Sequence, residues 1–209
     1  MAMTFRKPKT SIFYLKEGCI ATSLSWIFLS LFGCLPFYIS GEIPSFTNAL
    51  FETISGFTTT GASILEDVEA LSHCTLLWRS FTHWIGGMGI LVFVLAVLPM
   101  SGNRSMHILR AEVPGPTCGK ISSKLSDSAK ILYAIYFVMT VIETILLCAG
   151  GMPLFDALNT AFATAGTGGF GIKGDSIAGY SSYIQVVITV FMILFGVNFN
   201  AYFLILQKK

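Results

Sequence analysis

Long apolar stretches, separated by shorter polar ones, dominate the order of residues along this chain. A bilayer core of about 30 Å requires about 20 helical residues at 1.5 Å per residue. Four stretches predict transmembrane helices: Cys19–Ile39 and residues 85–100, 131–152 and 183–206. The helix of the second stretch is expected to begin near Leu76, and Glu143 alone interrupts the third.

Two shorter amphipathic stretches follow the first and the third of these segments. They cover residues 46–56 and 155–165, and each is too short to cross a membrane. Small residues and glycine follow each stretch before the next apolar segment begins. Each half of the chain therefore predicts a span, a re-entrant half-helix, an extended loop and a second span. A single gapless alignment of the two halves indicates an internal repeat, because it pairs Ala49-Leu50 with Ala157-Leu158 and Gly61 with Gly169.

The predicted fold is an all-α membrane protein of four transmembrane helices and two re-entrant half-helices. Residues 1–100 are expected to form the first span–pore-loop–span repeat, and residues 131–209 the second. Residues 101–130 contain Pro114-Gly115-Pro116, which indicates a linker between the repeats. Non-helical backbone at membrane depth is tolerated only where protein buries it or where it lines a water-filled path. Two such loops in one chain favour a pore.

The composition agrees with a bilayer environment. Of the 209 residues, 54% are hydrophobic and only 11% are charged, whereas soluble domains carry about a quarter charged residues. Five cysteines are an odd number, and at least three of them lie inside predicted spans. They are expected to be small membrane-embedded residues rather than a disulfide framework.

Basic residues recur in phase with the predicted spans. Eleven of the thirteen fall in three blocks: Arg6, Lys7, Lys9 and Lys16; Arg104, Arg110, Lys120, Lys124 and Lys130; and Lys208 and Lys209. Acidic residues collect in the two opposite loops. By the positive-inside rule, the linker and both termini are expected to be cytoplasmic in a multi-pass protein of the cell membrane.

The loops after the two half-helices carry the candidate chemistry. A potassium ion loses its water shell only where oxygens replace it, and backbone carbonyls are suitable donors. Glycine permits φ > 0, so that consecutive carbonyls can face one axis, and the negative end of the preceding half-helix favours a cation. The residues expected to form this selectivity filter are Thr59, Thr60, Gly61, Thr167, Gly168 and Gly169. A threonine-rich cap and a merely flexible glycine loop are the simpler alternatives.

Other polar residues in apolar surroundings have structural or functional interpretations. Glu143 is either a transport residue or a side chain that reaches interfacial water or pairs with Arg79. Glu52 could add negative potential behind the filter, but the favoured role is structural, in which it holds the first loop through hydrogen bonds to neighbouring backbone. His73, Cys74 and His83 lack zinc-site spacing, so no metal other than potassium in the filter is expected. No catalytic constellation is present, which argues against an enzyme.

Several segments together resemble the Trk/Ktr potassium transporter family, transmembrane subunit. Residues 51–61 (FETISGFTTTG) look like the first filter of this family, and residues 78–89 (WRSFTHWIGGMG) match the start of the helix that follows. Residues 109–112 (LRAE) and 167–170 (TGGF) resemble the linker and the second filter. The resemblance extends from about Lys16 to Asn200.

The resemblance implies a cation path built from four non-identical span–loop–span units around a pseudo-fourfold axis. It also implies potassium as the transported ion, no cofactor, no nucleic acid, and a cytoplasmic nucleotide-binding regulatory subunit as a partner. Only two units are present, so the chain alone is not expected to conduct. The remaining units would come from a second copy or a separate chain. The alternatives are a truncated, non-conducting structural or regulatory subunit and, more weakly, an intramembrane enzyme.

Overall fold

The computed structural model describes residues 15–89, 125–199, 201 and 202, and these residues contain helices and no strand. The first described range holds α1 (Leu15–Gly33), α2 (Leu35–Ile39), α3 (Phe46–Phe57) and α4 (His73–Met88). The second holds α7 (Leu125–Ala149), α8 (Leu154–Ala165) and α9 (Ser182–Gly196). The all-α fold class is thereby confirmed.

The helix starts follow from local sequence. Ser45 and Ser72 cap α3 and α4, because each hydroxyl accepts a hydrogen bond from the backbone N–H three residues later, at 3.4 Å. Pro153 precedes α8 in extended backbone. Ser45 therefore marks the start of α3, and Pro153 marks the start of α8.

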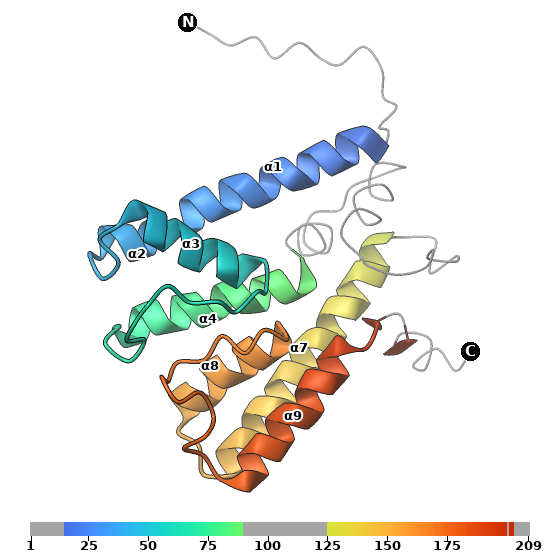
Figure 1. Cartoon of the computed structure of the whole chain (residues 1–209). Coiled ribbons are helices and arrows are strands. Elements are labelled where there is room, and N and C mark those ends of the chain that lie inside the picture. The colour runs from blue at the N-terminus through green and yellow to red at the C-terminus, as the bar shows by residue number, and fades with distance from the viewer. Residues whose placement is uncertain (1–14, 90–124, 200, 203–209) are drawn as a thin grey trace, which may run out of the picture.

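Figure 1 shows α3 lying between α1 and α4, with α8 on the far side of α4. The helix that begins with α1 is interrupted at Cys34, and Pro36 stands in the first turn of α2. Proline has no N–H to continue the hydrogen-bond ladder. Near this break, the Gly33 carbonyl accepts a hydrogen bond from the Trp78 indole N–H of α4 at 2.9 Å. The break thus ties the first apolar segment to α4.

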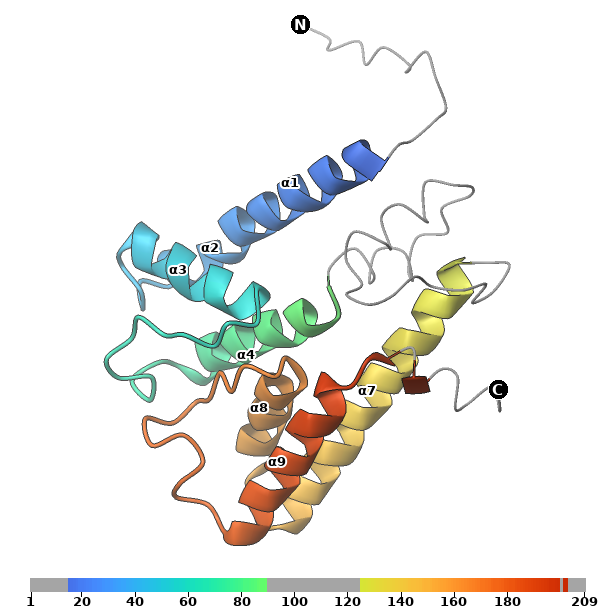
Figure 2. The same cartoon turned by 45° about the vertical axis from the view of Figure 1, so that its right-hand side comes forward.

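In the second half, α7 and α9 run side by side and α8 packs against both (Figures 1 and 2). Leu147, Ala157 and Ile184 form one buried cluster among these helices. Tyr136, Phe191 and Phe195 form another beside the end of α8. The end of α8 is therefore held between α7 and α9.

Two apolar segments are long enough to cross a membrane: Cys19–Ile39 and Lys130–Ala149, among the residues that the structure describes. The predicted continuous helix through residues 85–100 is wrong at Gly89, where α4 ends with φ 74°. Residues 90–100 lie outside the described residues. Likewise α9 ends at Gly196, before the predicted residue 206, and Val197 is extended.

The predicted linker, residues 101–130, overlaps the start of a helix. Residues 125–130 were assigned to the linker, but they form the first turns of α7, which begins at Leu125. Residues 101–124 lie outside the described part of the chain. The four cysteines that can be placed, Cys19, Cys34, Cys74 and Cys148, are all free thiols.

Candidate functional site: two loops at the ends of short helices

The two candidate loops begin at equivalent helix ends. The alignment that pairs Gly61 with Gly169 in the sequence also pairs the first and last residues of α3 with those of α8. Thr58 N–H donates to the Ile54 carbonyl at 2.8 Å, and Gly166 N–H donates to the Phe162 carbonyl at 3.3 Å. The carbonyl ends of both helices consequently point towards the loops, where their partial negative charge favours a cation.

The backbone of the two loops bends in the same way. Thr59 and Thr167 have φ of 54° and 58°, and Gly61 and Gly169 have φ of 74° and 65°. Positive φ is readily adopted by glycine and is unusual for a β-branched residue. Both loops therefore place left-handed backbone at the same two positions of the repeat.

The loops also touch each other. A Cβ atom added to Gly61 would overlap the backbone carbonyl of Gly168, and one added to Gly168 would approach the carbonyl oxygen of Thr59 at 2.5 Å. The structure thus brings Thr59, Gly61 and Gly168 together. Thr60, Thr167 and Gly169 are exposed parts of the same two loops.

Glu52 of α3 holds the first loop from behind. Its carboxylate is fully buried and accepts hydrogen bonds from the Ser63 hydroxyl at 2.9 Å and the Ile64 N–H at 3.0 Å. Acceptance of backbone and hydroxyl donors by an ionised carboxylate is a strong form of hydrogen bond. The predicted structural role of Glu52 is confirmed.

Arg79 of α4 joins the two loops. Its Nε donates to the Glu52 carboxylate at 2.6 Å, and its Nη1 donates to the Gly171 carbonyl at 2.6 Å. Its guanidinium carbon lies 3.4 Å from the centroid of the Phe170 ring. Glu143 does not pair with Arg79 and does not reach interfacial water, because it is fully buried between α7 and α8.

His83, one turn after Arg79, contacts the second loop again. Its Nε2 accepts a hydrogen bond from Gly168 N–H at 3.2 Å, and its ring stacks on Phe170 with centroids 5.3 Å apart. Because Nε2 is an acceptor, the ring proton of the neutral side chain belongs on Nδ1. The sequence analysis considered His83 only as a metal ligand, and this role was missed.

The glycines at the end of α4 allow close approach to both half-helices. A Cβ on Gly86 would overlap the Phe57 carbonyl, and one on Gly87 would overlap the Tyr136 hydroxyl and lie 3.1 Å from the Ala165 carbonyl. Small residues permit such close packing between membrane helices. Gly86 and Gly87 therefore allow α4 to pack closely against α3 and α8.

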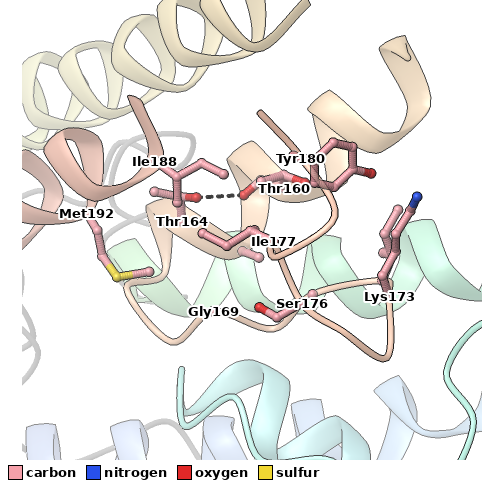
Figure 3. Close-up of a pocket in the computed structure, with 12 residues that line it drawn as sticks. Thr160, Thr164, Gly169, Lys173, Ser176, Ile177, Tyr180, Ile188 and Met192 are labelled. Atoms are coloured by element: carbon pink, nitrogen blue, oxygen red, sulfur yellow. Dashed lines mark hydrogen bonds between the residues drawn. The ribbon is translucent and has the colours of Figure 1, made fainter. Parts of the chain in front are cut away.

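A small cavity of about 70 Å³ lies behind the second loop (Figure 3). Thr160 and Thr164 of α8, Gly169 and Ser176 of the loop, and Met192 of α9 contribute to its wall. The Thr164 hydroxyl donates to the Thr160 carbonyl at 2.8 Å, as the dashed line marks. Gly169 consequently has space beside it that Gly61 lacks.

Polar contacts also join the segments that follow the loops. Tyr180 donates to the Asp156 carboxylate at 2.7 Å, and Lys173 lies 3.9 Å from the same carboxylate. Burial, followed by this hydrogen bond, raises the pKa of Tyr180. Gly174 N–H donates to Glu69 of the first half at 3.1 Å. Lys173 therefore lies within ion-pair distance of Asp156.

Comparison with known proteins places this arrangement in a family. Residues 2–209 match the family of TrkH, described as a cation transport protein. The chain belongs to the TrkH family. This confirms the resemblance seen in the sequence, and the relatives that follow are named as transporters rather than enzymes.

Two relatives illustrate the match. The Trk system potassium uptake protein TrkH of Escherichia coli is 39% identical over 198 residues, covering 93% of this chain and 41% of that protein. The crystal structure of the potassium transporter TrkH from Vibrio parahaemolyticus aligns with a TM-score of 0.74 at 31% identity, covering 95% of this chain and 39% of that one. The chain therefore spans about two fifths of the length of these relatives.

Proposed function

We propose that this chain takes part in potassium uptake across the cell membrane as two units of a four-unit cation pore. The observation that carries the proposal is the pair of loops after α3 and α8, which have positive φ at matching positions and contact each other. Its relatives in E. coli and V. parahaemolyticus are named as potassium transport proteins. Two equivalent loops in such a family are best explained as two parts of one ion path.

In this proposal, Thr59, Thr60, Gly61, Thr167, Gly168 and Gly169 form the parts of the selectivity filter that the chain supplies. Left-handed backbone at two positions of each loop permits successive carbonyl groups to face a common side. The carbonyl ends of α3 and α8 add negative potential at the same place. No cofactor is needed for this function, because backbone oxygens replace the water around the ion.

The two open edges of the chain support the existence of further units. Phe162 of α8 packs on Phe81 and Trp84 of α4, with ring centroids 5.9 and 5.6 Å apart. The counterpart of Phe162 in the first repeat is Ile54, which is 42% exposed on α3. Ile54 therefore lacks the helix that its counterpart has, and we infer that another unit supplies it.

The opposite edge is formed by α9. Apolar residues of α4 that face α8 include Phe81 and Trp84. When the first residues of α4 and α9 are aligned, Val190 and Ile193 take the same places on α9. These side chains are 47% and 66% exposed. We propose that the half-helix of a further unit covers them. That unit belongs to a second copy of this chain or to a separate chain.

The distribution of basic residues supports an orientation with both termini and residues 101–124 in the cytoplasm. A cytoplasmic nucleotide-binding regulatory subunit would then find its docking surface on that side. The two proposed repeats are residues 1–100 and 131–209, with α7 extending back into the linker as described above.

Cation flux in reconstituted vesicles tests the function. The chain is purified from membranes with its bound partners, and potassium flux is measured with and without competing sodium. We expect a flux that prefers potassium over sodium, and we expect Gly61→Ala to weaken this preference. An assembly that contains all four units and yet conducts no cation would contradict the proposal and favour a structural or regulatory subunit.

A further inference from the structure

The two candidate filter loops are connected through one buried ion pair. Arg79 is 2% exposed and Glu52 is 0% exposed. Glu52 binds the first loop just after its candidate filter residues, through Ser63 and Ile64. Arg79 binds the second loop just after its candidate filter residues, through the carbonyl groups of Gly171 at 2.6 Å and Phe170 at 3.4 Å. The chain of contacts runs from one loop to the other through buried side chains.

The chemistry of the pair suits this position. Guanidinium has donors that point in several fixed directions, so Arg79 can bind a carboxylate and a carbonyl at the same time, which a lysine ammonium on a flexible stem cannot reproduce. The pair has no net charge, and so a buried cation beside the ion path does not repel the transported ion. Arg79 and His83 are four residues apart on α4 and therefore share one helix face. From this face, His83 also contacts Gly168 and Phe170 of the second loop.

We propose that Glu52 and Arg79 are positioning residues that hold the two loops in fixed register and thereby set the preference for potassium over sodium. Discrimination between the two ions depends on where the carbonyl oxygens are held. Buried ionic groups whose removal leaves an unpaired charge are suited to fixing one arrangement among several. The effect on selectivity rests on the proposed function, whereas the link between the loops does not.

Hydrogen–deuterium exchange of the full chain in lipid nanodiscs tests the link. Backbone amides of residues 58–64 and 167–173 report on the two loops separately. In Arg79→Gln and Glu52→Gln, we expect exchange in both loops to become about tenfold faster or more, as loss of a charge-assisted hydrogen bond implies. In Arg79→Lys, we expect the first loop to stay protected and the second alone to exchange faster.

Ser80→Ala is the matched control. Ser80 is the next residue on α4, is fully buried, and its hydroxyl has no hydrogen-bond partner among the described residues. We expect exchange in both loops to be unchanged by this substitution. If Arg79→Gln does not fold, Arg79→Lys and Glu52→Gln decide the result. Exchange of the second loop that is the same in Arg79→Lys as in the wild type would overturn the link.

Sodium competition against rubidium uptake by the assembled transporter tests the consequence. We expect sodium to compete several-fold better in Arg79→Lys than in the wild type at matched expression, and Ser80→Ala to be unchanged. Unaltered competition together with faster exchange would refute the role in selectivity. An assembly without any cation uptake would refute the proposed function, while the exchange result would still stand on its own.

Discussion

Two threonines with left-handed backbone are the least expected residues in this chain. Thr59 and Thr167 have φ of 54° and 58°, where a β-branched side chain costs about 1–3 kcal/mol. Such strain persists only where surrounding contacts hold it in place, and it concentrates at functional sites. Its recurrence at the same position in two loops argues that the bend itself is needed, rather than being an accident of one turn.

The two loop glycines differ in the space around them, and this leads to a prediction. Gly61 has φ 74° and no room for a Cβ beside the Gly168 carbonyl, whereas a Cβ on Gly169, with φ 65°, would approach only Met192 Cε at 4.0 Å. We expect Gly169→Ala to cost about 1–2 kcal/mol from backbone conformation alone. Gly61→Ala should cost more, because the loops must also separate.

Thermal unfolding in nanodiscs measures both variants, and rubidium uptake with sodium competition measures their effect on the filter. Both substitutions are expected to weaken discrimination against sodium in the assembled transporter. Ala178, an exposed residue of the segment after the second loop, provides a control when replaced by glycine. Equal losses of stability at positions 61 and 169 would show that steric contact between the loops is unimportant.

Among whole elements, the two short helices α3 and α8 were predicted most closely. The sequence places them at residues 46–56 and 155–165, and the structure shows Phe46–Phe57 and Leu154–Ala165. A proline stands shortly before each helix and small residues follow each, so local signals mark the boundaries. By contrast, the end of α4 was missed, because the apolar sequence continues past Gly89 and hydropathy alone does not register a backbone break.

The start of α4 is expected to depend on pH. The Glu42 carboxylate accepts from the Ser72 hydroxyl at 2.6 Å and from the Ser72 N–H at 2.9 Å. The hydrogen bond from the Ser72 side chain lowers the pKa of Glu42 below 4.5. Its contribution to stability is therefore fully present above pH 4.5 and is lost as pH falls through the lowered value.

Unfolding temperatures of the wild type and Glu42→Gln between pH 7 and pH 3 test this dependence. The wild type should be more stable at pH 7, and the difference should vanish in acid. Ser72→Ala removes the helix cap as well and should cost about 1 kcal/mol at pH 7. Glu66→Gln, at an exposed position of the connection between α3 and α4, is the control. A difference that persists at pH 3 would show that Glu42 acts through packing instead of its charge.

For the molecule as a whole, the contacts that join the halves left no local pattern in the sequence. Arg79 was considered as a partner of Glu143, yet it binds Glu52 and a carbonyl 92 residues further along the chain. One signal did exist, since Arg79 and Lys173 are the basic residues outside the three basic blocks. A basic residue in an apolar segment requires a buried partner, but only the fold shows which carboxylate it finds.

The proposed open edge on α9 is testable with a bulky apolar residue. Lipid accommodates an added ring, whereas a packed helix interface does not. We expect Val190→Trp to reduce the fraction of chain recovered in the complete assembly, measured by mass in nanodiscs. Ile145→Trp on α7, which is also exposed, should leave that fraction unchanged. Full assembly of the Val190→Trp variant would place this edge against lipid.

The proposed orientation is testable by labelling. A single cysteine at Ser122, in a chain without its five native cysteines, should react with an impermeant reagent only after the cells are opened. The reason is that eleven of the thirteen basic residues lie on the side of residue 122 under the proposed topology. Reaction in intact cells would show that the orientation is opposite to the one proposed. Ser181→Cys, before α9, is the control and is expected to react from outside.

The contacts that Arg79 and His83 of α4 make with the second loop have a consequence for biosynthesis. Arg79 precedes Gly171 by 92 residues, so at about 5–20 residues per second the ribosome delivers this loop roughly 5–18 s after α4. The earlier helix, with Glu52 already beside it, is then available as a template when the later loop emerges. A fragment that starts at α7 would lack that template, and its loop should remain open to proteases however well α7, α8 and α9 insert.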